Sequence, residues 1–303
     1  MSEYRQISVE GRTILGKGGC GTVYRLDDDQ VVKVYEKRIS LPKIKREQKQ
    51  TKGYVDMGLP CENCYDIVRV GDAYGVILEL VDAKDMDEEI GAHRDMLDHY
   101  AIEMGKLLRK IHNCRPDVSV YPSTVEFYHN CVEKCKDEWL KDDEPLKLHR
   151  LIDAIPASGG LVHGDFHPKN IMAKDGKLKM IDVANSTSGH PVFDLLLSYY
   201  YMVLFPRDNP AGFAKKGAIT AEESFRIWEL MMRAYLSTDD TAKVKRVNDI
   251  LESYAMLKLI LTPASFINMK KELWSSFVEM GRKRLMPVID EVTGIVPKDF
   301  TEV

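Results

Sequence analysis

A short segment near the middle of the chain combines polar side chains at a spacing that suits catalysis. It reads His-Gly-Asp-Phe-His-Pro-Lys-Asn over residues 163–170 and lies between two apolar runs, so we expect a loop. It holds Asp165 and Asn170, and Asp182 follows within Lys-Met-Ile-Asp-Val. Phosphoryl transfer from a nucleotide requires such groups, because one carboxylate deprotonates the accepting hydroxyl while an amide oxygen and a second carboxylate hold Mg²⁺. The pattern predicts Asp165 as the base and Asn170 and Asp182 as metal ligands.

A glycine-rich stretch near the N-terminus is the second feature with a chemical meaning. It fits Gly-x-Gly-x-x-Gly-x-Val with Gly16, Gly18, Gly21 and Val23. Glycines let the backbone approach phosphates and point amide groups at them. A strand–turn–helix context would suggest a dinucleotide fold. Here β-type residues continue to Val34, so a hairpin that covers phosphates is favoured.

Lys33 stands among valines on the strand that follows the glycine-rich stretch. It either points to solvent from an edge strand or binds phosphates, and only its spacing from the other motifs favours the second role. Ser40 and Pro42 predict the start of a helix that runs to about Met57. Within that helix Glu47 is the candidate partner of Lys33. The alternative is a surface glutamate that pairs with nearby lysines.

Composition and charge exclude several classes of protein. The chain has 303 residues, of which 44% are hydrophobic and 30% charged, as in soluble globular proteins. A net charge of −4 without a long basic run argues against a nucleic-acid partner. The sequence shows no run of membrane-spanning length and no signal peptide, so we expect a cytoplasmic protein without membrane association. No obligate protein partner is evident.

The six cysteines suit a reducing compartment. Cys61 and Cys64 form half of a metal knuckle, whereas Cys131 and Cys135 stand at helical spacing elsewhere. Because a closed zinc site needs four well-spaced ligands, we expect free thiols rather than zinc.

The pattern of the whole chain predicts an α+β fold with a β-rich first part and a helical second part. Strands are expected over 6–35 and in a hairpin over 65–81, giving five strands, and a small hairpin is expected over 171–181. Helices are expected at 40–57, 96–112, 122–152, 193–205, 221–236, 241–261 and 266–286. We therefore predict two domains: a nucleotide-binding lobe at 1–81, and a helical lobe at 82–303 with the catalytic loop and substrate site.

Taken in order, these motifs resemble the protein-kinase-like superfamily, and within it the aminoglycoside phosphotransferase and choline kinase branch. The resemblance spans residues 12 to about 200. It implies a two-lobed fold in which a small five-stranded antiparallel β lobe with one helix precedes a larger, mainly helical lobe. It also implies a small-molecule kinase that transfers the γ-phosphoryl group of ATP, with GTP as an alternative donor, directly to a hydroxyl.

The resemblance assigns roles to further residues. Lys33, held by Glu47, would bind the α- and β-phosphates. The backbone carbonyl of Glu79 and the amide of Val81 would meet the adenine. His167 stands where protein kinases carry a lysine aimed at the γ-phosphate, and it either partly fills that role or only packs.

The resemblance also implies structural roles for two residues. Asp194 would anchor the backbone of the 163–170 segment. His112, at the end of the helix over 96–112, is read as a structural hydrogen-bonding group rather than a catalyst.

Protein substrates are disfavoured. Asp182 is followed by Val-Ala rather than Phe-Gly, and the interval to Asp194 is too short for a regulatory activation segment. A Ser/Thr protein kinase is therefore a poor second among enzymes. A nucleotide-binding pseudokinase that acts as a scaffold is the alternative from a different class, although no catalytic group is missing.

The acceptor stays open among aminoglycosides, choline-like alcohols, sugars and amino-acid alcohols. The acids within 82–98 are read first as a solvated helix face. Their second reading is a rim that faces a cationic substrate. Together with Asp142, Asp143 and Glu144 they favour a cationic or amino-bearing small molecule.

Overall fold

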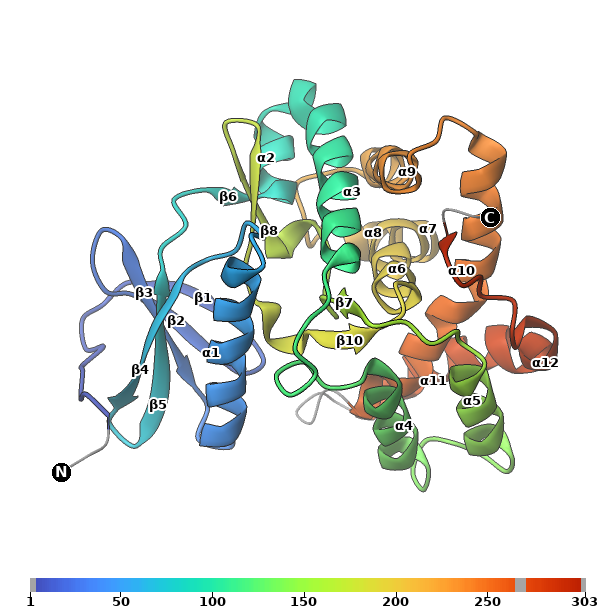
Figure 1. Cartoon of the computed structure of the whole chain (residues 1–303), viewed down its shortest axis with the longest axis horizontal. Helices are drawn as coiled ribbons and strands as arrows, with labels where there is room; N and C mark the ends of the chain where they lie inside the picture. The colour runs from blue at the N-terminus through green and yellow to red at the C-terminus, as the bar shows by residue number, and fades with distance from the viewer. Residues whose placement is uncertain (1–3, 265–270, 301–303) are drawn as a thin grey trace. The chain divides into compact units, whose positions relative to one another are not determined.

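The computed structural model describes residues 4–264 and 271–300 (Figure 1). The chain forms two compact units. The first comprises Met1–Met86 and Pro168–Asn185, and the second Asp87–His167 and Ser186–Val303. These packing units differ from the contiguous domains 1–81 and 82–303, because a segment from the middle of the chain packs with the N-terminal strands. The predicted division by function stays a prediction.

The first unit is built on an antiparallel sheet with the strand order β1-β2-β3-β5-β4. Its strands are β1 (Ile14–Lys17), β2 (Gly21–Arg25), β3 (Gln30–Tyr35), β4 (Cys64–Val70) and β5 (Ala73–Glu79). Helix α1 (Leu41–Asp56) packs on one face, where Ile44 joins Val31 and Tyr35 in a buried cluster (Figure 1). Because side chains alternate along a strand, Lys33 lies on the same face as these two residues. The five-stranded antiparallel sheet with one helix is confirmed.

The start of α1 differs from the prediction in one detail. Ser40 precedes the helix with an extended backbone, and a proline occupies the first turn, as expected. The Ser40 side chain, however, makes no capping hydrogen bond. The start of α1 therefore depends on the proline, whose fixed φ suits a first helical turn.

A second, three-stranded sheet in this unit has the order β6-β8-β9. It contains β6 (Lys84–Asp85), β8 (Ile171–Lys174) and β9 (Lys177–Met180), preceded by the 3₁₀ turn η2 (Pro168–Asn170) and followed by η3 (Val183–Asn185). Asp175 and Gly176 connect β8 to β9, and both have positive φ, at 50° and 74°. An Asp-Gly pair of this kind is typical of tight hairpins. The predicted hairpin over 171–181 is confirmed.

The second unit is mainly helical, with one short two-stranded sheet, β7 (Gly160–Val162) and β10 (Thr187–Gly189). Its longer helices are α3 (Leu97–Asn113), α4 (Thr124–Cys135), α5 (Glu144–Asp153), α6 (Val192–Tyr199), α9 (Ala221–Leu236), α10 (Thr241–Leu261) and α11 (Lys271–Leu285). Shorter elements are α2 (Met86–Ala92), η1 (Arg94–Met96), the π-helical turn η4 (Tyr200–Leu204), α7 (Phe205–Asp208), α8 (Pro210–Ala214), η5 (Thr262–Ala264), η6 (Met286–Val288) and α12 (Ile289–Val292). Helices α3 and α9 pack side by side, and every residue of α6 is buried (Figure 1).

Several predicted helices are confirmed, and others need correction. The helices expected over 221–236 and 241–261 match α9 and α10, and the run over 193–205 is a buried core segment as expected. The single helical stretch expected over 122–152 is wrong, because α4 ends at Cys135 and α5 begins anew at Glu144. Pro145 stands in the first turn of α5, where proline is tolerated but could not continue a preceding helix. Residues 266–270 lie outside the described residues.

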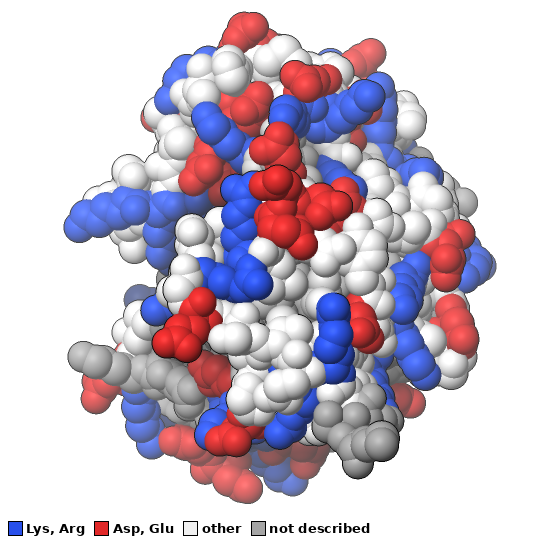
Figure 2. Space-filling view, turned by 90° about the vertical axis from the view of Figure 1, so that its left-hand side faces the viewer, with Lys and Arg blue, Asp and Glu red and all other residues white. Residues whose placement is uncertain are grey.

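None of the six cysteines, all within the described residues, forms a disulfide, and four of them are buried. Within residues 4–264 and 271–300, the helices are too short or too polar to cross a bilayer. On the face drawn in Figure 2, acidic and basic side chains are interspersed, which agrees with the small net charge.

Candidate active site

Three charged residues from distant parts of the sequence meet in the first unit. The Nζ atom of Lys33 lies 2.7 Å from Oε1 of Glu47 and 3.0 Å from Oδ1 of Asp182. The side chains of Lys33 and Glu47 are only 14% and 11% exposed, so this lysine does not point into solvent from an edge strand. The ion pair predicted between Lys33 and Glu47 is confirmed. We call these three residues the Lys33 cluster.

The cluster keeps its lysine charged. Burial by itself lowers the pKa of Lys33, but the charges of Asp182 and Glu47 outweigh burial and raise that pKa above its ordinary value. Asp182 differs from Glu47 because its side chain is 46% exposed. The cluster therefore presents a permanent positive charge together with a carboxylate that remains accessible.

The β8–β9 hairpin brings the backbone at Asn170 close to the backbone that leads into Asp182, so the two predicted metal ligands lie across the hairpin from one another. The N–H of Ile181 donates to the carbonyl of Asn170 at 3.1 Å. Asp182 is the next residue and has a φ of +57°, in the left-handed region. Its N–H donates to Oε1 of Glu62 at 3.2 Å. The predicted proximity of Asn170 and Asp182 along the hairpin is thus present in the backbone.

The glycine-rich turn joins β1 to β2. Its glycines differ in whether the surrounding structure has room for a side chain. The N–H of Gly18 donates to the carbonyl of Gly21 at 2.9 Å, which closes the turn. A Cβ at Gly21 would overlap the carbonyl of Val34 on the neighbouring strand, so strand pairing itself requires glycine there. A Cβ at Gly16 or Gly18 would meet no atom within 4 Å. Packing does not explain these two glycines, and they leave open space beside the backbone.

The predicted adenine contacts lie at the end of β5. The side chain of Glu79 accepts hydrogen bonds from Nδ2 of Asn63 at 2.6 Å and from Lys179. Burial raises the pKa of Glu79, but these partners outweigh it and lower the pKa. The carbonyl of Val81 accepts from the N–H of Ala83 at 2.8 Å. The role assigned to the backbone of Glu79 and Val81 stays a prediction.

A buried carboxylate holds the start of the 163–170 segment in the second unit. The two oxygens of Asp194 accept the N–H groups of His163 and Gly164, each at 2.7 Å. Asp194 also lies 3.0 Å from Nε2 of His112, whose Nδ1 lies 2.9 Å from the hydroxyl of Tyr235. The structural roles predicted for Asp194 and His112 are confirmed.

Asp165 is half-buried beside two histidines of the same segment. Its N–H donates to Nδ1 of His163 at 3.3 Å, and its Oδ1 lies 3.4 Å from Nε2 of His167. Burial acts to raise the pKa of Asp165, but the hydrogen bond and charge of His167 outweigh it and place the pKa below its ordinary value. The carboxylate is therefore ionised at neutral pH, the form that a general base requires. The ring of Tyr201 lies 4.8 Å from that of His167.

Three residues near these groups escaped the sequence reasoning. Glu62 follows α1 in an irregular segment, where no spacing marks it. Tyr201 stands in an aromatic run that was read as core, and the π-helical turn η4 carries it beside His167. Lys258 lies on α10. Burial lowers the pKa of Lys258, and this effect outweighs the charges of Cys131 and Asp165, which act to raise it. A π-helical turn within an α-helical segment often marks a functional site, but periodicity alone does not show one.

Two acidic residues of the segment 82–98 form hydrogen bonds with other parts of the chain, which the sequence did not predict. Asp87 is buried and accepts the N–H groups of Ala218 and Ile219 at 2.8 and 3.3 Å. Asp98 pairs with Arg226. The reading of the segment as a solvated helix face is therefore wrong for Asp87, whereas the side chain of Asp98 is 49% exposed and forms a surface ion pair. Glu144 is also buried and bonds to Arg282.

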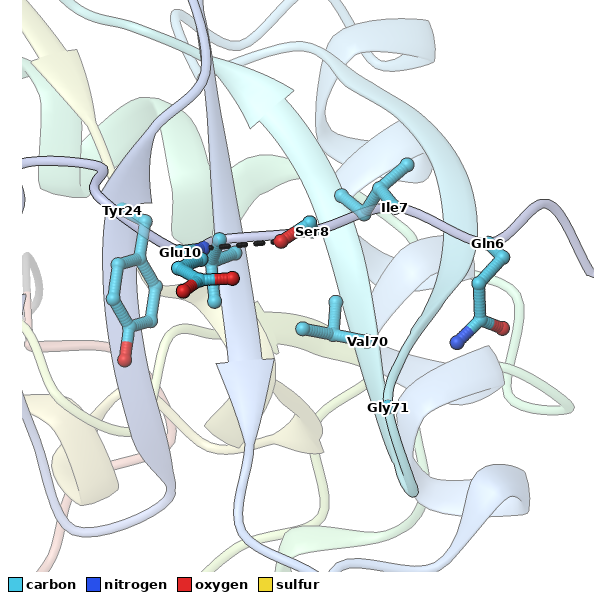
Figure 3. Close-up of a pocket in the computed structure, with 8 residues that line it drawn as sticks. Gln6, Ile7, Ser8, Glu10, Tyr24, Val70 and Gly71 are labelled. Atoms are coloured by element: carbon cyan, nitrogen blue, oxygen red, sulfur yellow. Dashed lines mark hydrogen bonds between the residues drawn. The ribbon is translucent and has the colours of Figure 1, made fainter.

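The first unit also has a separate pocket of about 830 Å³ (Figure 3). Its residues Tyr24 and Val70 pack against a cluster with Val32, whose side chain lies on the sheet face opposite to that of Lys33. Ile7, Tyr24 and Val70 line the pocket, and the N–H of Glu10 donates to the hydroxyl of Ser8 at its rim. Its lining contains none of the predicted site residues. We therefore take the Lys33 cluster of the first unit and Asp165 of the second unit as the candidate functional groups, rather than this pocket.

The sequence matches a family described as "Phosphotransferase enzyme family" over residues 13–230. A search of curated proteins finds no match. Similar solved structures include a streptomycin–ATP complex of APH(2″)-IIa, at 15% identity and a TM-score of 0.60, covering 93% of this chain and 94% of that one. A complex of the amicoumacin kinase hAmiN with AMP-PNP, Ca²⁺ and Ami is 16% identical with a TM-score of 0.62, covering 99% and 93%. A choline/ethanolamine kinase family protein from Mesorhizobium loti is 14% identical with a TM-score of 0.61, covering 94% and 93%. These likenesses confirm the predicted protein-kinase-like fold.

Proposed function

Because this chain belongs to the phosphotransferase enzyme family, we propose that it transfers the γ-phosphoryl group of ATP to a hydroxyl of a small molecule. The observation that carries the proposal is the Lys33 cluster. It unites a buried, charged lysine from β3 with carboxylates from α1 and from the end of the β8–β9 hairpin. Phosphoryl transfer depends on such placed charges, since the reaction is accelerated mainly by positioning and electrostatic stabilisation.

The first unit supplies the groups that would hold the nucleotide. Lys33, fixed by Glu47, binds the α- and β-phosphates. The turn with Gly16 and Gly18 fits phosphates because its backbone is bordered by open space. The backbone of Glu79 and Val81 binds the adenine. GTP is the alternative donor, and the Kd values of ATP and GTP, measured by calorimetry, distinguish the two.

Asn170 and Asp182 would hold Mg²⁺, which when bound neutralises charge on the phosphates. The donor set fits this ion, because Mg²⁺ prefers oxygen ligands and is commonly held by one or two carboxylates together with phosphates and water. Asp182 is half-exposed and thus accessible to an ion that arrives with the nucleotide. Its contact with Lys33 ties the metal ligand to the phosphate-binding lysine.

Asp165 accepts the proton of the substrate hydroxyl as the latter attacks. The carboxylate is in its ionised form, and Asp194 fixes the backbone of the two residues before it. His167 contacts Asp165 and orients it. The acceptor is a small-molecule alcohol. The argument for a cationic acceptor is weaker than the sequence suggested, because Asp87, Asp98 and Glu144 already have partners within the protein.

The proposal is tested by ADP release over a panel of aminoglycosides, choline-like alcohols, amino-acid alcohols and neutral sugars. With the best acceptor, Asp165→Asn should lose turnover by at least about 100-fold, the usual contribution of a general base, while ATP binding is kept. Asp137→Asn, an exposed position of the same unit, is the matched control. Turnover of Asp165→Asn at the wild-type rate would show that Asp165 is not the base. ATP binding without ADP release over the whole panel would favour the scaffold alternative.

A further inference from the structure

We propose that Glu62 is a positioning residue that holds the metal ligand Asp182 in its left-handed backbone conformation. The proposal rests on the proposed function, since it concerns the metal ligand assigned there. Glu62 itself lies outside the sequence motifs. It is identified by its contacts within the first unit.

The segment before Glu62 is fixed against the strand that leads to Asp182. The N–H of Met180 donates to the carbonyl of Pro60 at 2.7 Å, and the N–H of Glu62 donates back to the carbonyl of Met180 at 3.1 Å. These two bonds place Cys61 beside Met180, the last residue of β9. The Glu62 carboxylate can therefore reach the N–H of Asp182, two residues further along, at 3.2 Å.

Asp182 needs such a partner because of its backbone. A positive φ is unfavourable for any residue with a Cβ, and it persists where the surrounding structure holds it. A hydrogen bond from the backbone N–H to a side-chain oxygen stabilises that backbone conformation, and leaving the N–H without an acceptor would be unfavourable. The bond from Asp182 to Glu62 thus fixes the direction in which the Asp182 side chain leaves the backbone.

Glu62 acts through Asp182 rather than as a further ligand. Among the described residues, no three His, Cys, Asp or Glu side chains are arranged to hold one metal ion. Glu62 is only 8% exposed. Burying a carboxylate is unfavourable, so its presence beside Asp182 points to a specific role.

The test measures ATP binding by calorimetry, with Mg²⁺ and with EDTA, for the whole chain. The Kd in EDTA divided by the Kd in Mg²⁺ gives the factor by which the metal strengthens ATP binding, called the gain from the metal. Glu62→Ala should reduce this gain by about 10-fold, as removal of a residue that supports a metal ligand commonly does, while the Kd in EDTA stays within about twofold. Glu62→Gln keeps an acceptor oxygen and should retain most of the gain. Glu10→Ala, an exposed glutamate of the same unit, should behave as wild type.

Asp182→Asn separates this inference from the proposed function. If Asp182→Asn leaves the gain from Mg²⁺ unchanged, Asp182 is not a metal ligand and the proposed metal site is wrong. If Asp182→Asn loses the gain while Glu62→Ala keeps it, the metal site stands and the role of Glu62 is refuted. Should Glu62→Ala melt below the assay temperature, Glu62→Met, which keeps the volume without the acceptor, replaces it. A wild-type gain in that variant overturns the inference equally.

Discussion

At the scale of single residues, Asp194 gives the clearest link between stability and activity. It is fully buried and accepts two backbone N–H groups, of His163 and Gly164, besides contacting His112. Asp194→Ala leaves these buried donors unpaired and should lower the free energy of unfolding by roughly 3 kcal/mol, measured by urea denaturation. The loss in Asp194→Asn should be smaller, because its amide oxygen still accepts one N–H. Equal stability of Asp194→Ala and wild type would refute the anchoring role.

The ionisation of Asp165 predicts a pH dependence of stability. Its folded-state pKa is lowered, so the ionised carboxylate interacts favourably in the folded protein. The resulting stability is present above the unfolded-state pKa near 4 and is lost as the pH falls through the folded-state pKa. Thermal unfolding should therefore show wild type more stable than Asp165→Asn at pH 7, with the difference shrinking below about pH 4. A difference that grows on acidification would contradict the assignment.

At the scale of elements, the glycine-rich turn makes two separable predictions within one motif. Gly21→Ala should destabilise the protein by about 1–3 kcal/mol, because its Cβ would overlap the carbonyl of Val34. Gly18→Ala meets no neighbouring atom and should change the free energy of unfolding by less than about 0.5 kcal/mol. It should instead weaken ATP binding. Thermal melting and calorimetry distinguish the effects, and Gly18→Ala with wild-type affinity would argue against a phosphate role for the turn.

Elements with strong local signals could be predicted from the sequence. Helix α9 begins at Ala221 after the capping box of Thr220 and Glu223, and α10 begins after the capping residue Asp240. Both helix starts are therefore determined by residues next to them in the sequence. The Asp-Gly turn likewise marks the β8–β9 hairpin. The break between α4 and α5 is not evident in the sequence, because the mostly charged stretch between the two helices contains no glycine or proline, although Pro145 in the first turn of α5 is a usable signal.

Those residues of the candidate site that belong to sequence motifs with a fixed spacing could be predicted, and the other residues could not. Lys33 and Asp182 are far apart in sequence, yet their motifs suggested a common role, and they lie 3.0 Å apart. Glu62 and Tyr201 take part through tertiary contacts, namely a backbone hydrogen bond and a ring contact. Neither contact leaves a periodic trace in the sequence. The partners of Asp87 likewise lie more than a hundred residues away.

At the scale of the whole molecule, the residues proposed to hold the nucleotide belong to the first packing unit and the proposed base Asp165 to the second. The chain crosses from one to the other between His167 and Pro168, inside the motif that first suggested catalysis. A contiguous division of the sequence could not show this, because packing of the β8–β9 hairpin with the first unit depends on long-range strand pairing. The base and the metal ligands therefore belong to different packing units although they are near neighbours in the sequence.

The central claim is that the Lys33 cluster binds the phosphates of a nucleotide. Calorimetric titration of ATP in Mg²⁺ into Lys33→Met tests it most directly, with Lys37→Met, an exposed lysine paired with Asp72, as the matched control. Loss of the buried cation should weaken binding by at least about 10-fold, since a charge-assisted hydrogen bond contributes roughly 1.5–3 kcal/mol, whereas Lys37→Met should bind as wild type does. Both variants should first be shown to be folded by thermal melting. Equal affinity of folded Lys33→Met and wild type for ATP would contradict the account.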